Sequence, residues 1–277
     1  MEKTEIYYFS GTGNSLHIAK ELERRIPNIQ LIPIVGLSNE ENVKTKAENV
    51  GFVFPIYFTT IPTVVRRFIE RLNLDSAQYI FSIVTRAGSF CVANINVRRI
   101  LKKKKKTLDA HFILNMAYNT PTGLKPGKGY DKWVEKIDAK NIDDLESEIQ
   151  SQLNEIEKTI LNKDRHPKKL GFHPFRGLLE RIMYALTRNI KTQIKYITDS
   201  SCTGCGICEK VCLSNKIKLD NKKPYWDENI RCYYCYACFN FCPTQSILVK
   251  KKWERKDGRY HHPDVNLKDI IHQKKNS

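Results

Sequence analysis

The sequence predicts an α/β protein in two parts: a doubly wound parallel sheet, followed by a small cysteine-rich α+β unit. Three observations support this organisation. Short β-prone runs alternate with amphipathic helical segments over residues 1–162, and a Gly-rich turn joins the first strand to the first helix. Eight of the 9 cysteines fall between Cys202 and Cys242. Strands that alternate with helices are typical of right-handed βαβ units and a parallel sheet.

Each element of the first part is identified by its pattern of hydrophobic residues. The expected strands cover residues 4–9, 29–34, 50–54, 79–85 and 111–117, and the expected helices cover 16–26, 62–72, 92–105 and 143–162. The last helix carries one apolar stripe, formed by Leu145, Ile149, Leu153, Ile156 and Ile160. We expect this stripe to cover the sheet. Pairing with a partner helix in a coiled coil is the alternative.

Composition and charge set the boundaries between the parts. A chain of 277 residues, 41% of them hydrophobic and 28% charged, has room for one medium and one small domain. The predicted divisions are 1–162 for the sheet domain, 163–195 for a basic helical linker, 196–252 for the cysteine-rich domain and 253–277 for a basic tail. An amphipathic helix is expected at 174–190, either packed between the domains or lying on an anionic membrane surface. The tail, with His261 and His262, is expected to be disordered.

The formal net charge of +17 narrows the choice of partners only a little. Acidic redox proteins, nucleic acid and an anionic membrane surface are all compatible with it. Nucleic acid is not expected, because the basic run from Arg98 to Lys106 has no interleaved base-stacking aromatic residues. Residues 1–20 show no signal-peptide pattern, and no apolar run approaches the roughly 18 residues of a membrane span. A reducing cytoplasm is therefore expected, and the oligomeric state stays open.

The loop between the first strand and the first helix reads Ser10-Gly11-Thr12-Gly13-Asn14-Ser15. Backbone N–H groups and hydroxyls at the start of a helix suit a phosphate, which the helix dipole stabilises. The loop is not a dinucleotide-binding G-x-G-x-x-G, and no Gly-Lys-Ser/Thr follows it as in a Walker loop. We therefore expect a monophosphate held by the three hydroxyl residues. An empty structural turn is the alternative.

Two cysteine motifs of equal spacing carry the chemistry of the second part. Cys202, Cys205, Cys208 and Cys212 are followed, 30 residues later, by Cys232, Cys235, Cys238 and Cys242. Three closely spaced thiolates bind three irons of a [4Fe–4S] cubane, and a cysteine from the other motif reaches the fourth. One predicted cluster thus uses Cys202, Cys205, Cys208 and Cys242, and the other uses Cys232, Cys235, Cys238 and Cys212. Zinc normally takes two thiolates from each of two separated pairs, so this pattern disfavours zinc.

The Gly-rich loop resembles the phosphate loop of the flavodoxin family, Ser/Thr-x-Thr-Gly-x-Ser/Thr, at each fixed position. The resemblance implies strand order 2-1-3-4-5, with FMN beside the first and third strands. It also implies flavin contacts from two further loops. The loop with Pro55, Ile56, Tyr57 and Phe58 offers a ring to stack on the isoalloxazine, although ordinary core or surface aromatics are the alternative. The loop with Thr85 and Gly88 departs most from the family, because it lacks the second stacking Tyr and the acidic residues.

Residues 196–252 resemble the bacterial two-cluster ferredoxins, with Leu213 where that family usually has Pro. The whole chain resembles the flavodoxin–ferredoxin fusions of anaerobic bacteria and archaea. This resemblance implies an electron carrier in which two [4Fe–4S] clusters exchange electrons with FMN, and no catalytic residue is assigned. Two alternatives stay open. One is a reductase in which the flavin acts on a small organic substrate, with Tyr57 as the evident proton donor. The other is a cluster-binding sensing or docking module without flavin.

Overall fold

The computed structural model describes residues 2–88, 91–119, 139–165, 195–250, 256 and 258–275. Its first part is a five-stranded parallel sheet of order β2-β1-β3-β4-β5, which confirms the expected fold class. The strands are β1 (Thr4–Tyr8), β2 (Ile29–Pro33), β3 (Asn49–Pro55), β4 (Tyr79–Arg86) and β5 (Ala110–Asn115). β1 pairs with both β2 and β3, so the strand order reverses beside β1. In doubly wound sheets a ligand binds at the carboxyl ends of the strands at this point.

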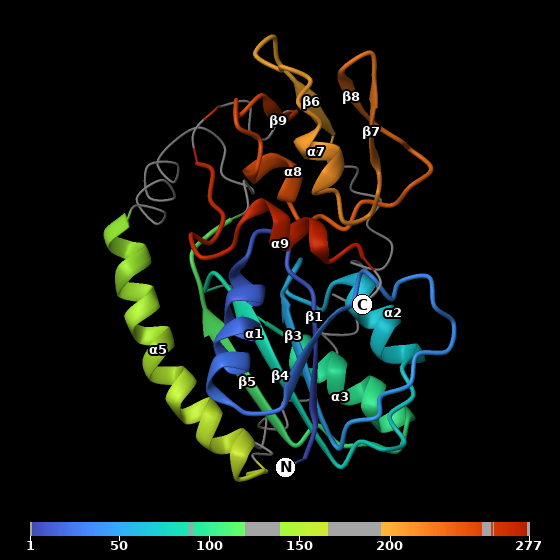
Figure 1. Ribbon diagram of the computed structural model, residues 1–277, viewed down its shortest axis with the longest axis vertical. Helices are drawn as coiled ribbons and strands as arrows, with labels where there is room; N and C mark the ends of the chain where they lie inside the picture. Colours follow the sequence, from blue (N-terminus) through green and yellow to red (C-terminus); the bar gives the residue numbers. More distant parts are fainter. Residues whose placement is uncertain are drawn as a thin grey trace, which may run out of the picture.

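Helices cover both faces of the sheet (Figure 1). They are α1 (Asn14–Arg25), α2 (Thr63–Arg71), α3 (Ala93–Lys103) and α5 (Ala139–Leu161). The apolar stripe of α5 is buried from Ile149 to Ile160, and this helix packs against β5 and α1. The prediction that it covers the sheet is therefore confirmed, and the coiled-coil alternative is wrong. Burial of this stripe removes four aliphatic side chains from water, each worth roughly 1.5–3 kcal/mol.

The cysteine-rich part is a separate small unit above the carboxyl ends of the strands (Figure 1). It has two antiparallel strand pairs, β6 (Tyr196–Thr198) with β9 (Ile247–Val249) and β7 (Ile217–Asp220) with β8 (Lys223–Trp226). Each cysteine motif contains one short helix, α7 (Ile207–Lys210) in the first and α8 (Ala237–Asn240) in the second. Ile217 and Ile247, which are equivalent in the repeat, each begin a strand and are buried. The two motifs thus fold as two similar halves.

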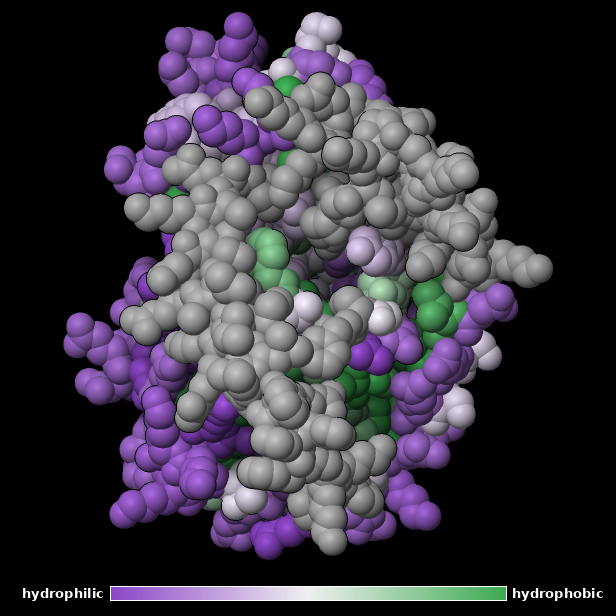
Figure 2. Space-filling model, turned by 180° about the vertical axis from the view of Figure 1, so that it is seen from behind, coloured by the Kyte–Doolittle hydropathy of each residue, from purple (hydrophilic) through white to green (hydrophobic). Residues whose placement is uncertain are grey.

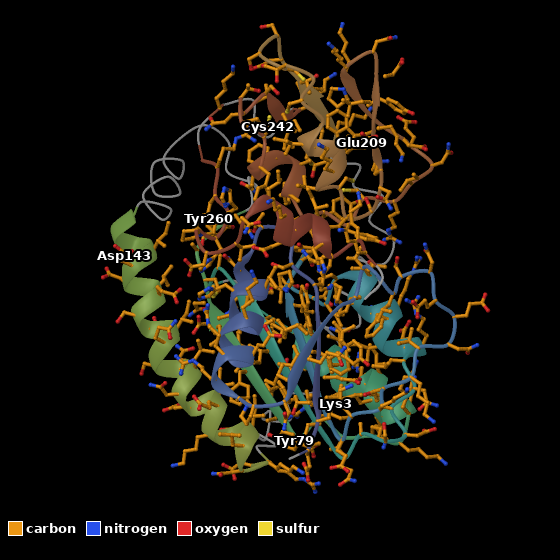
Figure 3. All side chains as sticks on the ribbon, in the orientation of Figure 1. Lys3, Tyr79, Asp143, Glu209, Cys242 and Tyr260 are labelled. Carbon is orange, nitrogen blue, oxygen red and sulfur yellow. The ribbon has the colours of Figure 1, made fainter. Side chains whose placement is uncertain are left out.

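The C-terminal tail is ordered over residues 258–275, His261 and His262 included, which corrects the expectation of disorder for this part. Its helix α9 (Leu267–His272) begins with a capping box, in which the Asn266 side chain accepts from two backbone N–H groups and Asp269 bonds back to Asn266. Such a box satisfies donors that a helix start leaves unpaired. The tail lies between the two units, and Tyr260 appears at this level in Figure 3. The apolar Val265 and Ile270 are fully buried, so the tail is held by packing that its basic composition conceals.

Hydrophilic side chains dominate the described rim of the molecule seen from behind, and hydrophobic residues gather nearer the middle (Figure 2). Among the described residues, no helix has the length and apolar character needed to cross a membrane. The amphipathic helix expected at 174–190 lies outside the described residues. The predicted domain boundaries stay predictions.

Candidate functional site

The first group of thiols comes from both cysteine motifs. Cys202, Cys205 and Cys208 line a small cavity together with Cys242 of the second motif, which Figure 3 shows in the upper unit. Cys242 Sγ lies 3.3 Å from Ser246 Oγ and 3.7 Å from Thr244 Oγ1. Burial raises the pKa of Cys242, but hydrogen bonds from Ser246, the Ile247 backbone and Thr244 outweigh it, so the net shift is downward. These donors favour a thiolate at this position.

The second group of thiols is more deeply buried. Cys212 of the first motif is near enough to raise the pKa of Cys232, Cys235 and Cys238, although burial is the largest cause in each case. Burial raises the pKa of Cys232 to about 11. Without metal the thiols of Cys232, Cys235 and Cys238 are therefore protonated at neutral pH, and cluster assembly must release their protons. This grouping is the one that the sequence predicts for exchanged fourth ligands, and iron binding by these thiols stays a prediction.

The two motifs repeat one backbone geometry with different side chains. Gly204 and Gly206 have φ of 68° and 77°, and the equivalent Tyr234 and Tyr236 have φ of 59° and 55°. Positive φ favours glycine, and a bulky residue there costs of order 1–2 kcal/mol. The Tyr234 N–H donates to Cys232 Sγ at 3.3 Å, so this conformation brings a donor to a thiol. The second motif therefore has two strained tyrosines at the positions where the first motif has two glycines.

The Gly-rich loop is buried and retains the donors that an anion needs. Ser10 Oγ accepts from the Gly13 N–H at 3.1 Å, Thr12 Oγ1 accepts from the Asn119 amide, and Ser15 Oγ shares a 2.8 Å hydrogen bond with Thr85 Oγ1. A hydroxyl that accepts still has its own proton to donate. Within the described part of the chain, the N–H groups of residues 11, 12, 14 and 15 have no acceptor. A helix start with unpaired N–H groups fits a phosphate.

Space and polar groups suited to the rest of an FMN adjoin this loop. Asn14 Nδ2 donates to the Ala117 carbonyl at 3.0 Å. Ala117, Gly88 and Tyr118 line a cavity of about 360 Å³. Asn14 Oδ1 is buried without a partner among the described residues. Such an oxygen calls for a donor like a hydroxyl of a ribityl chain. The residues present therefore fit FMN, which would rest its phosphate on residues 10–15.

Both the second cysteine motif and the tail cover the Gly-rich loop. A Cβ at Gly11 would overlap the carbonyl oxygen of Cys235 and lie 2.7 Å from its Cβ. From the tail, the His262 N–H donates to the Thr12 carbonyl at 2.8 Å. The Gln273 amide accepts from the Ser10 N–H at 3.0 Å and donates to its carbonyl at 2.8 Å. Sequence reasoning missed Gln273 and His262, and the only local signal for an ordered tail is the capping box.

The loop after β3 turns its aromatic rings toward the cysteine-rich unit. Tyr57 and Thr60 exchange backbone hydrogen bonds of 3.0 and 3.1 Å around Phe58 and Thr59, which have φ of 51° and 66°. Burial, followed by the proximity of Cys235, raises the pKa of Tyr57 well above its usual value, so its phenol stays protonated. The Phe58 ring packs edge-on against Tyr234 at a centroid distance of 5.4 Å. Pro55 and Ile56 connect this turn to the end of the sheet.

A flavodoxin-like sheet joined to a unit with two repeated cysteine motifs defines a two-domain redox protein. Residues 5–120 match the family model described as a flavodoxin domain, and residues 201–247 match the 4Fe-4S dicluster domain. An uncharacterized ferredoxin of Methanocaldococcus jannaschii is 35% identical over an alignment of 75 residues, and the match covers 24% of this chain and 97% of that protein.

The chain therefore belongs to the ferredoxin family through its C-terminal domain, and it carries a flavodoxin domain before it. These two domains support a redox electron-transfer role with iron–sulfur and flavin cofactors.

Proposed function

We propose that this protein is an electron carrier with two [4Fe–4S] clusters and one FMN. Cys202, Cys205, Cys208 and Cys242 bind one cluster, and Cys232, Cys235, Cys238 and Cys212 bind the other. FMN, which exchanges one or two electrons, rests its phosphate on residues 10–15. The protein works in the cytoplasm with redox partner proteins, and its net charge of +17 favours acidic ones.

The contact between Gly11 and Cys235 carries the proposal. It places the loop suited to the flavin phosphate against the carbonyl and Cβ of Cys235, a residue of the second group of thiols, with no side chain between the two backbones. Electron transfer requires a short distance between a cluster and the isoalloxazine, and Tyr57, from the loop expected to stack on that ring, lies beside Cys235 and Cys232 of the same group of thiols. The tail holds the contact in place, because Arg259 donates to the carbonyls of Phe239, Gln245 and Ile247 while Gln273 binds Ser10.

The chain's own groups shield and orient the sites. The buried ring of Tyr236 packs edge-to-face with both Tyr196 and Phe239, beside the second group of thiols. Such packing excludes water, and water exclusion together with hydrogen bonds to sulfur sets cluster potentials. At the other site, the hydroxyls of Ser10, Thr12 and Ser15 and the unpaired N–H groups orient an anion.

The test is the cofactor content of anaerobically purified protein. Iron, sulfide and flavin should be present in the ratio of two cubane clusters to one FMN per chain. Tightly bound zinc without sulfide would contradict the proposal, and intact clusters without flavin would favour a sensing or docking module instead.

The ligand assignment is tested with matched cysteine variants. Cys242→Ala should remove the first cluster and Cys212→Ala the second, as read by electron paramagnetic resonance of the reduced protein. Cys91→Ala is the control, because Cys91 is buried in the sheet domain, far along the chain from both motifs. Loss of only the second cluster in Cys242→Ala would show that the fourth ligands are not exchanged.

A further inference from the structure

A second cleft lies beside the second group of thiols, apart from the Gly-rich loop. It has a volume of about 410 Å³ and runs between the start of α2 and the second cysteine motif. Its walls are formed by Cys232, by the rings of Tyr57, Phe58, Tyr233 and Tyr234, and by three arginines and one glutamate. None of residues 10–15 and none of the described residues in the loop after β4 contributes to it. The volume falls in the range of small-molecule sites.

We propose that this cleft binds a planar aromatic molecule with a negative charge, such as a sulfonate, carboxylate or phosphate. The proposal rests on the proposed function in one respect, namely that Cys232 is a cluster ligand. It goes beyond that function because it adds a small-molecule site next to the second cluster.

The aromatic preference comes from rings that are exposed at the cleft. Phe58 is 42% exposed, which is unusual for such a large apolar side chain. It lies at φ 51° in a tight turn and is followed by Thr59 at φ 66°, a conformation that β-branched residues rarely adopt. Such strain persists where the surroundings enforce it and gathers at binding sites. The turn thus holds the Phe58 ring at the rim of the cleft. Because Phe58 and Tyr234 meet edge to face, part of the ring surface stays open for a flat ligand.

The charge preference comes from the arginines. Arg66, Arg67 and Arg231 line the cleft, against the single carboxylate of Glu70. Arg66 is half-buried and its guanidinium donates to Asn96 Oδ1 at 3.0 Å, which anchors one positive charge at the wall. Arg67 and Arg231 are exposed, so their guanidinium groups can reach a ligand. Guanidinium groups bind oxyanions through paired N–H donors and also stack on aromatic planes.

The cleft directly borders the second group of thiols. Cys232 is one of its walls, so a bound ring touches the residues that enclose the second group of thiols. The small cavity among the thiols of the first group has no aromatic or arginine side chain in its lining, although Cys242 also borders a larger hollow with Phe241 and Arg259. The second group therefore faces the flavin loop on one side and the cleft on the other.

The experiment compares two anthraquinones on the full-length protein loaded with clusters and saturated with FMN. The probes are anthraquinone-2-sulfonate and the neutral 2-(hydroxymethyl)anthraquinone, measured by equilibrium dialysis under anaerobic conditions. The sulfonate should bind at least about tenfold more tightly, because hydrogen bonds between guanidinium groups and an oxyanion are charge-assisted. The Arg67→Ala/Arg231→Ala variant should lose this preference, and Phe58→Ala should weaken both probes. Arg24→Ala, a change at an exposed arginine of α1, should bind both as the unchanged protein does.

Equal binding of the two probes, or an unchanged preference in Arg67→Ala/Arg231→Ala, would overturn the proposal. So would displacement of the sulfonate by FMN, because it would place the probe on the flavin site. Iron, sulfide and flavin are measured on the same samples. Failure of the proposed function then appears as missing cofactor, and failure of this inference appears as missing binding in a fully loaded protein.

Discussion

Replacement of Gly11 by Ala tests the contact on which the electron-carrier proposal rests. In the flavodoxin pattern this position accepts any residue, so a methyl group there is compatible with phosphate binding. In this chain the added Cβ would overlap the Cys235 carbonyl and lie 2.7 Å from Cys235 Cβ, a separation that real structures do not tolerate. One of the two backbones must therefore move. We expect the second cysteine motif to separate from the loop while the loop still binds phosphate.

The expected cost follows from overpacking at a tight backbone contact, roughly 1–3 kcal/mol. A loss of this size makes local opening about five to 150 times more frequent. Hydrogen exchange of the amides in residues 10–15 and 232–238 should accelerate within this range. Both segments should respond together, because they are the two sides of one contact.

The control is Gly88→Ala, where an added Cβ meets nothing within 4 Å. Gly88 has φ 77°, so the control includes the backbone strain of losing a glycine but not the steric overlap. Unchanged exchange in Gly11→Ala, or an equal change at residues 232–238 in Gly88→Ala, would show that the two units do not touch at Gly11.

Two further predictions concern the tail and the loop. Burial lowers the pKa of His262, and a hydrogen bond with His17, followed by one with His262, lowers that of Glu146. In the unfolded chain the pKa values of His262 and Glu146 return to about 6.5 and 4.5, so the unfolded state binds more protons than the folded state. The free energy of unfolding should therefore fall as the pH drops below about 6.5 and again below about 4.5. The slope is at most about 1.4 kcal/mol per pH unit for each proton. Thermal unfolding between pH 8 and 4 measures this, and a slope that persists below pH 6.5 in His262→Gln would refute the role of that group. Ser10→Ala/Thr12→Ala should weaken FMN binding roughly tenfold or more by fluorescence titration, and unchanged affinity would place the phosphate elsewhere.

The sheet and the cysteine groups were predictable because their signals are local. The predicted strands Val50–Phe54 and Tyr79–Thr85 are mostly apolar runs, and each maps onto a strand of the structure, β3 and β4. The cysteine spacing repeats after 30 residues and so implies two halves of one unit. In both cases the pattern that specifies the structure lies within one short segment.

The enclosure of the Gly-rich loop was not predictable, because its contacts join residues far apart in sequence. Gln273 binds Ser10 across 263 residues through one amide group, and glutamine at a chain end carries no pattern. The tail reads as basic and polar, while the residues that fix it are few: Val265 and Ile270 are fully buried, and each directly follows an aspartate. Composition reports the average of a segment, whereas docking depends on a few of its side chains.

The tyrosines of the second motif explain why the two motifs are not interchangeable. Tyr234 and Tyr236 occupy the positions that Gly204 and Gly206 occupy in the first motif. Positive φ at Tyr236 costs of order 1–2 kcal/mol, but its ring is 5% exposed and packs on Tyr196 and Phe239, and such burial contributes roughly 1.5–3 kcal/mol. Burial therefore offsets the strain. Tyr234 instead contacts Phe58 of the sheet domain, so its ring stabilises the junction between the units. The glycines of the first motif have no such contacts, which identifies the second motif as the one shaped for the flavodoxin domain.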